Sequence, residues 1–199
     1  MAQGPGLAKL RQTMGVVREE SISTKLRVVF NGSAKSSNSV SLNEALYTSP
    51  KLQPEVFKIF LNLRTFAIAI SVDTEKMYPQ IRIHSEVEDF LIITWRSDPN
   101  QSLSTYRLLT VIFGTSCGCY LAIRTLHQLA ADEISTSSEA CKIIREHFYV
   151  DDLLTAANSV FHAKVLVSEV NRVVQKGGFT LKKWASNVLD VLDSISSRM

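Results

Sequence analysis

An almost unbroken apolar run, Phe66 to Val72 (FAIAISV), ends at the acidic residue Asp73. Such a run, without the polar alternation of a half-exposed strand, is typical of a strand that is buried on both faces. The 45% apolar content of the 199-residue chain is ample for a core, in one domain or one domain plus a fragment. We therefore expect a central strand over 66–72 that carries a carboxylate at its end.

Two adjacent aspartates, Asp151 and Asp152, lie between the apolar runs Phe148–Val150 and Leu153–Ala157. These runs predict two short strands with the aspartates at the hairpin tip, where aspartate is an ordinary turn residue. A strand that ends at Asp73 beside a hairpin with two more carboxylates would also make a site for hard divalent cations. Two such ions support an in-line phosphoryl transfer. A structural turn and a metal site both fit the pattern.

The remaining patterns mix helices and strands along the chain. Thr136 and Glu139 have capping-box spacing for one of the helices. This order favours an α+β fold with a mainly antiparallel sheet. Helices are expected from Pro54 onward and at 120–131 (with Leu121, Leu126 and Leu129 inward), 138–147 and 163–175, and strands at 26–30, 89–95, 106–113 and 179–184.

Composition excludes several classes of protein. The net charge of +3 permits a nucleic-acid partner without requiring one. Cys117 and Cys119 are too close together for the usual zinc spacing, and three cysteines do not make a disulfide framework, so free thiols in a reducing compartment are expected. No apolar window of membrane-spanning length and no signal peptide is present, which predicts an intracellular protein without a membrane partner.

The tetrapeptide Tyr149-Val150-Asp151-Asp152 is the catalytic signature of retroviral and retrotransposon reverse transcriptases. The stretch from about Gly15 to Asn187 resembles the polymerase of Pao-type (BEL/Pao) LTR retrotransposons. The resemblance implies a reverse-transcriptase-like palm, a mainly antiparallel sheet packed with helices, together with partial fingers. It is carried by six ordered blocks: LRVVFNGSAKSSNSVSLNEAL (26–46), SVDTEKMYPQI (71–81), YRLLTVIFGT (106–115), YLAIRTLHQLA (120–130), FYVDDLLTAA (148–157) and GGFTLKKWASN (177–187).

The resemblance also implies roles for individual residues. Asp73 and Asp151 would bind Mg²⁺, or Mn²⁺ in its place, with the backbone carbonyl of Val72 or Thr74, and Asp152 would be the second acid of the hairpin. The nucleotide would meet five further residues: Arg27 at the triphosphate, Tyr78 as the aromatic gate against a 2′-hydroxyl, Gly114 where backbone approaches the nucleotide, and Lys182 or Lys183 as the proton donor to pyrophosphate. Tyr78 could equally be a core tyrosine, and either lysine a solvated surface charge.

The chain departs from the pattern of its relatives in three places. Asn31-Gly32-Ser33 stands where relatives carry Asp-Ala-Ser, Pro79 stands where they commonly carry Arg, and Cys117-Gly118-Cys119 replaces a Ser-Ala-Pro-like segment. We expect a loose N-terminal lead-in at 1–14, an incomplete fingers/palm domain at 15–190 without thumb or RNase H, and a C-terminal tail at 191–199.

Two functions follow from the resemblance. The first is an RNA-directed DNA polymerase, part of a retrotransposon polyprotein, in which a primer 3′-hydroxyl on an RNA or DNA template attacks a dNTP. It would act in the cytoplasm, with virus-like particles as a second location. The alternative is a truncated, non-catalytic remnant that binds nucleic acid or protein, or that has no selected role.

Overall fold

The computed structural model describes residues 13–17, 26–37 and 39–196, which form two compact units. The first unit comprises residues 1–50 and 81–119, and the second comprises residues 51–80 and 120–199. Strand β1 (Thr13–Val17) includes the last two residues of the expected lead-in, and the rest of that lead-in lies outside the described residues. The expected fingers/palm domain is therefore divided between two units, which we describe separately.

The first unit contains two small antiparallel sheets, β1 with β2 (Leu26–Phe30) and β4 (Ile92–Trp95) with β5 (Ser104–Arg107). Helix α1 (Leu42–Ala45) begins at a capping box, in which the Ser41 and Glu44 side chains satisfy each other's backbone N–H. The buried core of this unit is formed by Leu42 and Ile112, with Phe30, Leu46, Leu91, Ile93 and Leu108 packed against them.

The two strands predicted at 89–95 and 106–113 are shorter than expected. The first is preceded by a 3-10 helix, Ser85–Phe90, and β5 ends at Arg107. Residues 108–113 do not form a regular strand, although Val111 and Ile112 are buried. The Leu108 N–H donates to the Leu91 carbonyl and the Val111 N–H donates to the Ile81 carbonyl, so this segment bonds to two separate parts of the chain. An apolar run predicts burial, but it does not by itself distinguish a strand from an irregular buried segment.

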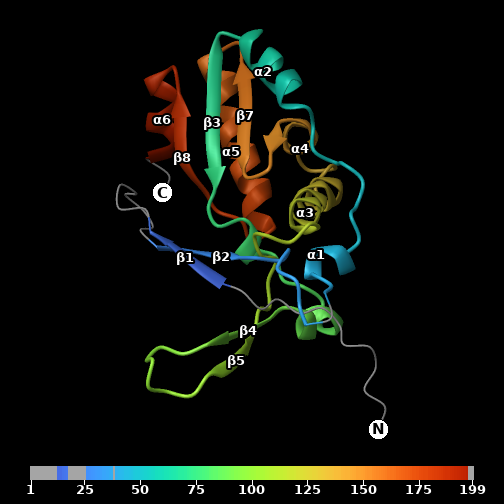
Figure 1. Cartoon of the computed structure of the whole chain (residues 1–199). Coiled ribbons are helices and arrows are strands. Elements are labelled where there is room, and N and C mark those ends of the chain that lie inside the picture. Colours follow the sequence, from blue (N-terminus) through green and yellow to red (C-terminus); the bar gives the residue numbers. More distant parts are fainter. Residues whose placement is uncertain (1–12, 18–25, 38, 197–199) are drawn as a thin grey trace. The chain divides into compact units, whose positions relative to one another are not determined.

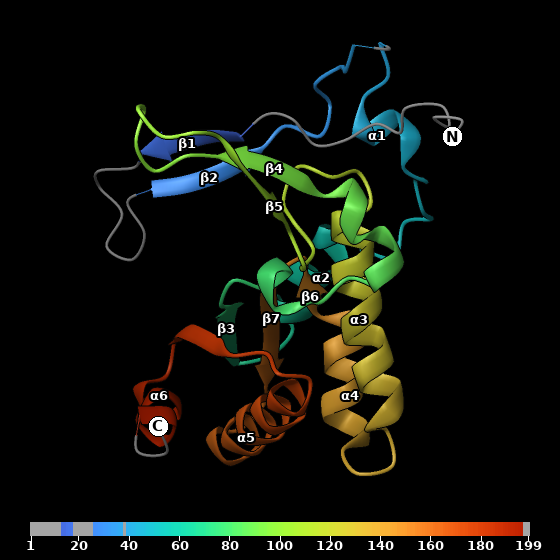
Figure 2. The ribbon, with the colours of Figure 1, turned by 90° about the horizontal axis from the view of Figure 1, so that it is seen from below.

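The second unit is built on an antiparallel four-stranded sheet in the order β6-β7-β3-β8. Figures 1 and 2 show α5 and α6 on one face of this sheet and α2 on the other. No helix in the described part of the chain is long and apolar enough to cross a membrane. The bounds are β3 Ile68–Thr74, β6 Phe148–Tyr149, β7 Asp152–Ala157, β8 Leu181–Ser186, α2 Val56–Arg64, α3 Gly118–Asp132, α4 Ser138–Glu146, α5 Val160–Lys176 and α6 Leu189–Ser196.

The central strand β3 runs two residues farther toward the C-terminus than predicted and includes Asp73. Its burial alternates, with Ile68, Ile70, Val72 and Thr74 buried and the intervening side chains half-buried. The prediction of a strand buried on both faces is therefore wrong, because the side chains on one face of β3 are buried and those on the other are only half-buried.

Helix α3 buries a different stripe from the one predicted. Leu126 is fully buried and Leu129 half-buried, but Leu121 is 37% exposed, and Ala122 and Ile123 are buried instead. The buried face of α3 thus includes Leu126 as predicted, together with Ala122, Ile123 and Ala130. Helix α5 buries Leu166, Val170 and Val173 as predicted.

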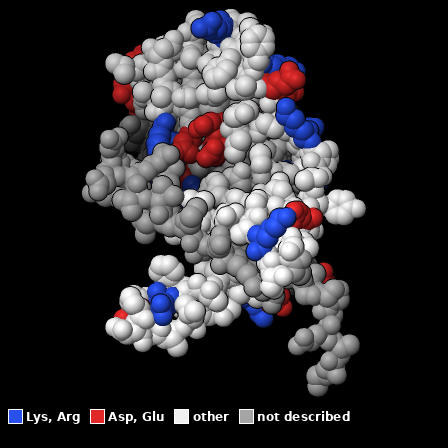
Figure 3. Space-filling model, in the orientation of Figure 1, with Lys and Arg blue, Asp and Glu red and all other residues white. Residues whose placement is uncertain are grey.

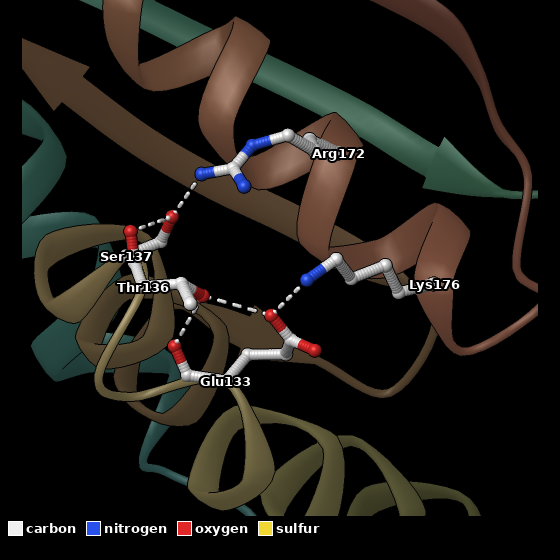
Figure 4. A network of polar contacts seen from close by, with 5 residues as sticks. All are labelled: Glu133, Thr136, Ser137, Arg172 and Lys176. Carbon is white, nitrogen blue, oxygen red and sulfur yellow. Dashed lines mark hydrogen bonds and ion pairs between the residues drawn. The ribbon is translucent and has the colours of Figure 1, made fainter.

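The predicted capping box at Thr136 and Glu139 does not form. The N-cap of α4 is Ser137, and the Thr136 hydroxyl instead donates 2.8 Å to the Glu133 carboxylate at the end of α3. Figure 4 shows that Lys176 of α5 contacts the same carboxylate and that Arg172 contacts the Ser137 hydroxyl. These contacts commit the Thr136 hydroxyl to Glu133 and connect the α3–α4 turn to α5.

The expected C-terminal tail is not a tail over most of its length. Residues 189–196 form α6, which packs against α5 and β8 and fully buries Val191. Apolar residues at Val191 and Ile195 have helical i, i+4 spacing, which explains the helix.

Candidate active site

The hairpin β6–β7 turns through two residues, Val150 and Asp151, because Tyr149 pairs directly with Asp152. Asp151 therefore lies at the tip, whereas Asp152 is the first residue of β7, which corrects the prediction that both aspartates occupy the turn. Val150 has φ 57°, a left-handed conformation that a β-branched residue rarely adopts. Such a residue costs about 1–3 kcal/mol and persists only where its surroundings impose it.

The pairing of β7 with β3 brings the aspartates to one end of the sheet. Asp73 is directly opposite Asp152, and the Thr74 N–H donates 2.8 Å to the Asp151 carbonyl. Side chains directly opposite in an antiparallel pair lie on the same face, with Cβ atoms about 4.5–5.5 Å apart. Figure 3 shows acidic side chains gathered at the end of β3 with a basic side chain beside them.

A β-bulge in β8 directs a lysine toward this cluster. Between Ser71 and Asp73 the register of the β3–β8 pair shifts by one residue, and Lys183 has φ 59°. Bulges re-aim side chains, and the Lys183 ammonium contacts the Asp73 carboxylate. Lys182 instead forms an ion pair with Glu75 at 2.7 Å. The structure thus separates the two lysines by partner.

The pKa of Asp152 is raised within the acidic cluster. Although Asp152 is exposed as a residue, desolvation of its carboxyl group raises its pKa, and the negative charges of Asp151 and Asp73 raise it further. Lys183 lowers this pKa and so offsets part of the effect. The hydrogen bond from Lys182 is the main cause of the lowered pKa of Glu75. The carboxylates near Asp152 therefore repel one another without a complete counter-charge.

Comparison with known proteins shows the fold. No protein-family model matches the chain, and no curated protein matches it. It is similar to a solved structure of the foamy viral protease-reverse transcriptase dRH in complex with ds DNA, with a TM-score of 0.62 and 14% sequence identity. The fold is that of a reverse transcriptase. The match covers 84% of this chain and 25% of that chain, so this chain spans about a quarter of its length. The predicted fold class is confirmed, and the Pao-type subtype stays a prediction.

The reverse-transcriptase fold raises the question whether these residues fit a divalent metal. Within the described residues no group of three or more Asp, Glu, His or Cys side chains is arranged to hold one. Val72 and Thr74 flank Asp73 and are buried, and the Thr74 hydroxyl has no hydrogen-bond partner among the described residues. All available donors are oxygens, and Mg²⁺ needs only one or two carboxylates when substrate phosphates complete its shell. These oxygen donors therefore fit Mg²⁺ when substrate phosphates supply the remaining ligands.

The other predicted site residues are distributed over both units. Tyr78, in the 3-10 helix Tyr78–Gln80 of the second unit, is only 6% exposed, as a core tyrosine would be. Gly114 of the first unit has φ 92°, and a Cβ there would lie 2.0 Å from the Phe30 carbonyl oxygen. Arg27 lies in β2, and its side chain is outside what the structure describes. Their roles at a nucleotide stay predictions.

Two amide side chains that sequence reasoning missed organise the loops of this fold. In the first unit, the Asn43 amide donates 3.0 Å to the Gly114 carbonyl and accepts 2.8 Å from the Ser116 N–H. In the second unit, the Gln53 amide bonds to backbone groups of the hairpin. The Asn43 contacts join residues 71 and 73 positions apart, and no local pattern signals either side chain.

His147, directly before the hairpin, is held in one tautomer by two polar neighbours. The Asn62 amide nitrogen lies 3.1 Å from Nε2, and the Thr155 hydroxyl lies 2.9 Å from Nδ1. Because an amide nitrogen only donates, Nε2 accepts and Nδ1 carries the proton. Desolvation lowers the pKa of His147, with Glu146 opposing it and Lys142 adding to it. The folded protein therefore holds this imidazole neutral.

Acid should destabilise the second unit through His147. A histidine with a lowered pKa in the folded state stabilises the fold above its unfolded pKa of about 6.5 and loses that contribution as pH falls through the folded pKa. Protonation also places a second donor opposite the Asn62 amide, which costs about 1–3 kcal/mol. We expect the free energy of unfolding, measured by urea titration, to fall between pH 7 and pH 5. A His147→Gln variant should show a flatter profile, and an equally steep one would contradict this assignment.

Proposed function

We propose that this chain is the fingers and palm part of the RNA-directed DNA polymerase of a Pao-type (BEL/Pao) LTR retrotransposon polyprotein. The observation that carries the proposal is the strand register that sets Asp73 opposite Asp152 and bonds Thr74 to Asp151. On a reverse-transcriptase fold, this register brings three aspartates to one end of the sheet. The ordered sequence blocks support the subtype.

The carboxylates of Asp73, Asp151 and Asp152, with the backbone carbonyl of Val72 or Thr74, would hold Mg²⁺ or Mn²⁺. When bound, such ions activate the attacking hydroxyl and stabilise the negative charge of an in-line phosphoryl transfer. The chain's own contribution is to hold these oxygens together on a rigid sheet. Desolvation and, after it, repulsion from Asp151 and Asp73 raise the pKa of Asp152, and a bound cation would relieve that repulsion.

The basic residues would handle the phosphates of the dNTP. Of the two candidate lysines, Lys183 would give a proton to the leaving pyrophosphate, and its contact with Asp73 supports this choice. Lys182 is paired with Glu75 and would act at most as a second cation. Arg27 would bind the triphosphate through its fork of donors. Tyr78 would be the aromatic gate against a 2′-hydroxyl. Gly114 would allow its backbone to approach the template and the incoming nucleotide.

The partners follow from this reaction. The foamy viral structure contains double-stranded DNA, and we propose that this chain binds a template with its primer through backbone phosphates. Such binding weakens steeply as salt is raised, because counterions released on binding must be recaptured. We propose that the reaction takes place in the cytoplasm, with virus-like particles as a second location.

A single-nucleotide extension assay tests the proposal. The purified chain is incubated with a primed RNA template, one complementary dNTP and millimolar Mg²⁺ or Mn²⁺. We expect extension of the primer by one residue that depends on the divalent ion and falls as salt is raised. Folded protein that binds the primed template but does not extend it under any of these conditions would reject the polymerase.

The alternative is a non-catalytic remnant that binds nucleic acid or protein, or that has no selected role. One observation favours it: the Lys183 ammonium contacts the Asp73 carboxylate, which a metal would otherwise use. Template binding that persists without any effect of divalent ions would support this alternative over the enzyme.

A further inference from the structure

The side chain of Gln53 bonds to one backbone group of the hairpin strand β6 and to one of the turn that follows it. Its Nε2 donates 2.8 Å to the Phe148 carbonyl, and its Oε1 accepts 3.0 Å from the Val150 N–H. Gln53 is half-buried, and both contacts lie inside the second unit. One side chain therefore satisfies two groups on either side of Tyr149.

These two groups, on either side of Tyr149, are not used in the pairing of β6 with β7. β6 is an edge strand, and Tyr149 uses its pairing positions to bond with Asp152 of β7. In an antiparallel ladder, the carbonyl of residue i and the N–H of residue i+2 then point toward the open edge. A primary amide offers one donor and one acceptor, so Gln53 pairs with this edge as a neighbouring strand would.

The same contacts reach the candidate active site. Val150 is in the left-handed conformation, and its N–H is held by Gln53, while the carbonyl of the next residue, Asp151, accepts from Thr74. The turn that carries Asp151 is thus bonded on both sides.

Gln53 itself is anchored to the sheet that carries the aspartates. It lies just before α2, and α2 packs on β7 with Ile59 almost fully buried. Because Gln53 precedes a helix that packs on the sheet, its two hydrogen bonds can hold the turn in place; we call this pair of bonds the Gln53 clamp. We propose that Gln53 is a positioning residue, which holds the Val150–Asp151 turn so that the Asp151 carboxylate is placed for metal binding. This inference rests on the proposed polymerase function.

Three substitutions in the full 199-residue chain separate positioning from packing. Gln53→Met keeps the length and removes both hydrogen bonds. Gln53→Glu keeps the acceptor for Val150 and loses the donor to Phe148, and Gln53→Asn keeps the amide but is one methylene too short. Gln128→Met is the matched control, because Gln128 also makes two side-chain hydrogen bonds, but to Arg124 and Asp132 of its own helix.

The first readout is hydrogen exchange of the Val150 amide, followed by NMR. We expect exchange about tenfold faster in Gln53→Met and Gln53→Asn than in wild type, an intermediate rate in Gln53→Glu, and no change in Gln128→Met. If Gln53 acted only by packing, the Val150 amide would exchange as slowly in Gln53→Met as in wild type. Unchanged protection in Gln53→Met would overturn the clamp, whatever the function of the chain.

The second readout is Mn²⁺ affinity, measured by electron paramagnetic resonance. Gln53→Met should bind Mn²⁺ about tenfold more weakly, in the range found when a residue supporting a metal ligand is removed. Faster exchange with unchanged Mn²⁺ affinity would overturn the positioning role and leave a purely structural bond. If wild type itself binds no Mn²⁺, the polymerase proposal fails at this site, and the positioning role fails with it; the exchange data still decide whether the clamp exists.

Discussion

Replacing Asp73 with asparagine is expected to reduce single-nucleotide incorporation by more than about 100-fold while leaving the fold intact. Loss of a group that only supports a metal ligand costs roughly 10–100-fold, and loss of the ligand itself should cost more. The fold should survive, because the ion pair that Asp73 makes with Lys183 is partly exposed, with the lysine side chain 67% and the aspartate side chain 25% accessible. Exposed pairs contribute only about 0–1 kcal/mol.

Thermal melts give an independent measurement of the same site. In wild type, millimolar Mg²⁺ should raise the melting temperature by mass action, because the unfolded chain lacks the assembled carboxylates. Asp73→Asn should lose this increment. Asp132→Asn is the control, since Asp132 lies in α3 of the same unit and accepts a hydrogen bond only from Gln128 in the described contacts. Full incorporation by Asp73→Asn would remove Asp73 from the reaction.

Replacing Gly114 with alanine should disrupt the first unit. Its φ of 92° costs an alanine about 1–2 kcal/mol. The new Cβ would also lie 2.0 Å from the Phe30 carbonyl oxygen, a backbone atom that cannot rotate away. Overpacking of this kind adds about 1–3 kcal/mol. We expect a total loss of about 2–5 kcal/mol, measured by chemical denaturation.

Gly178→Ala separates the two causes of this loss. Gly178 has φ 80°, but a Cβ there would meet nothing within 4 Å. It should therefore cost only the conformational part, about 1–2 kcal/mol. Equal losses in both variants would show that the Phe30 carbonyl moves aside without cost. The Asn43 amide bonds to both the Gly114 carbonyl and the Ser33 hydroxyl. A shift of Gly114 should therefore reach the loop over 31–33, and we expect this loop to lose protection from hydrogen exchange in Gly114→Ala.

The central strand and the hairpin could be predicted from the sequence because both are local patterns. An apolar run that ends at Asp73, and two runs on either side of Asp151-Asp152, are sufficient to place three carboxylates at strand ends. The left-handed Val150 could not be predicted, since β-branched residues disfavour that conformation. The Val150 N–H bonds to the side chain of Gln53, which is 97 residues away in the chain.

The same limit applies to the strands of the first unit. The apolar run over 106–113 correctly indicated burial of Val111 and Ile112, but β5 ends at Arg107. The hydrogen-bond partners of a buried segment come from parts of the chain that are distant in sequence. Here they are the residues around Ile81 and Leu91. The pattern of side chains alone does not contain that information.

The class of fold, the order of the main elements and the acidic residues could all be inferred from patterns in the sequence. The pairing of strands was needed to show that Asp152, not Asp151, lies opposite Asp73, because the register is set by a two-residue turn. It also decided that a bulge turns Lys183 toward Asp73 while Lys182 pairs with Glu75. Composition and periodicity indicate which segments are buried. Which side chains lie close together depends instead on strand register and backbone bends, and these are set by backbone hydrogen bonds between distant parts of the chain.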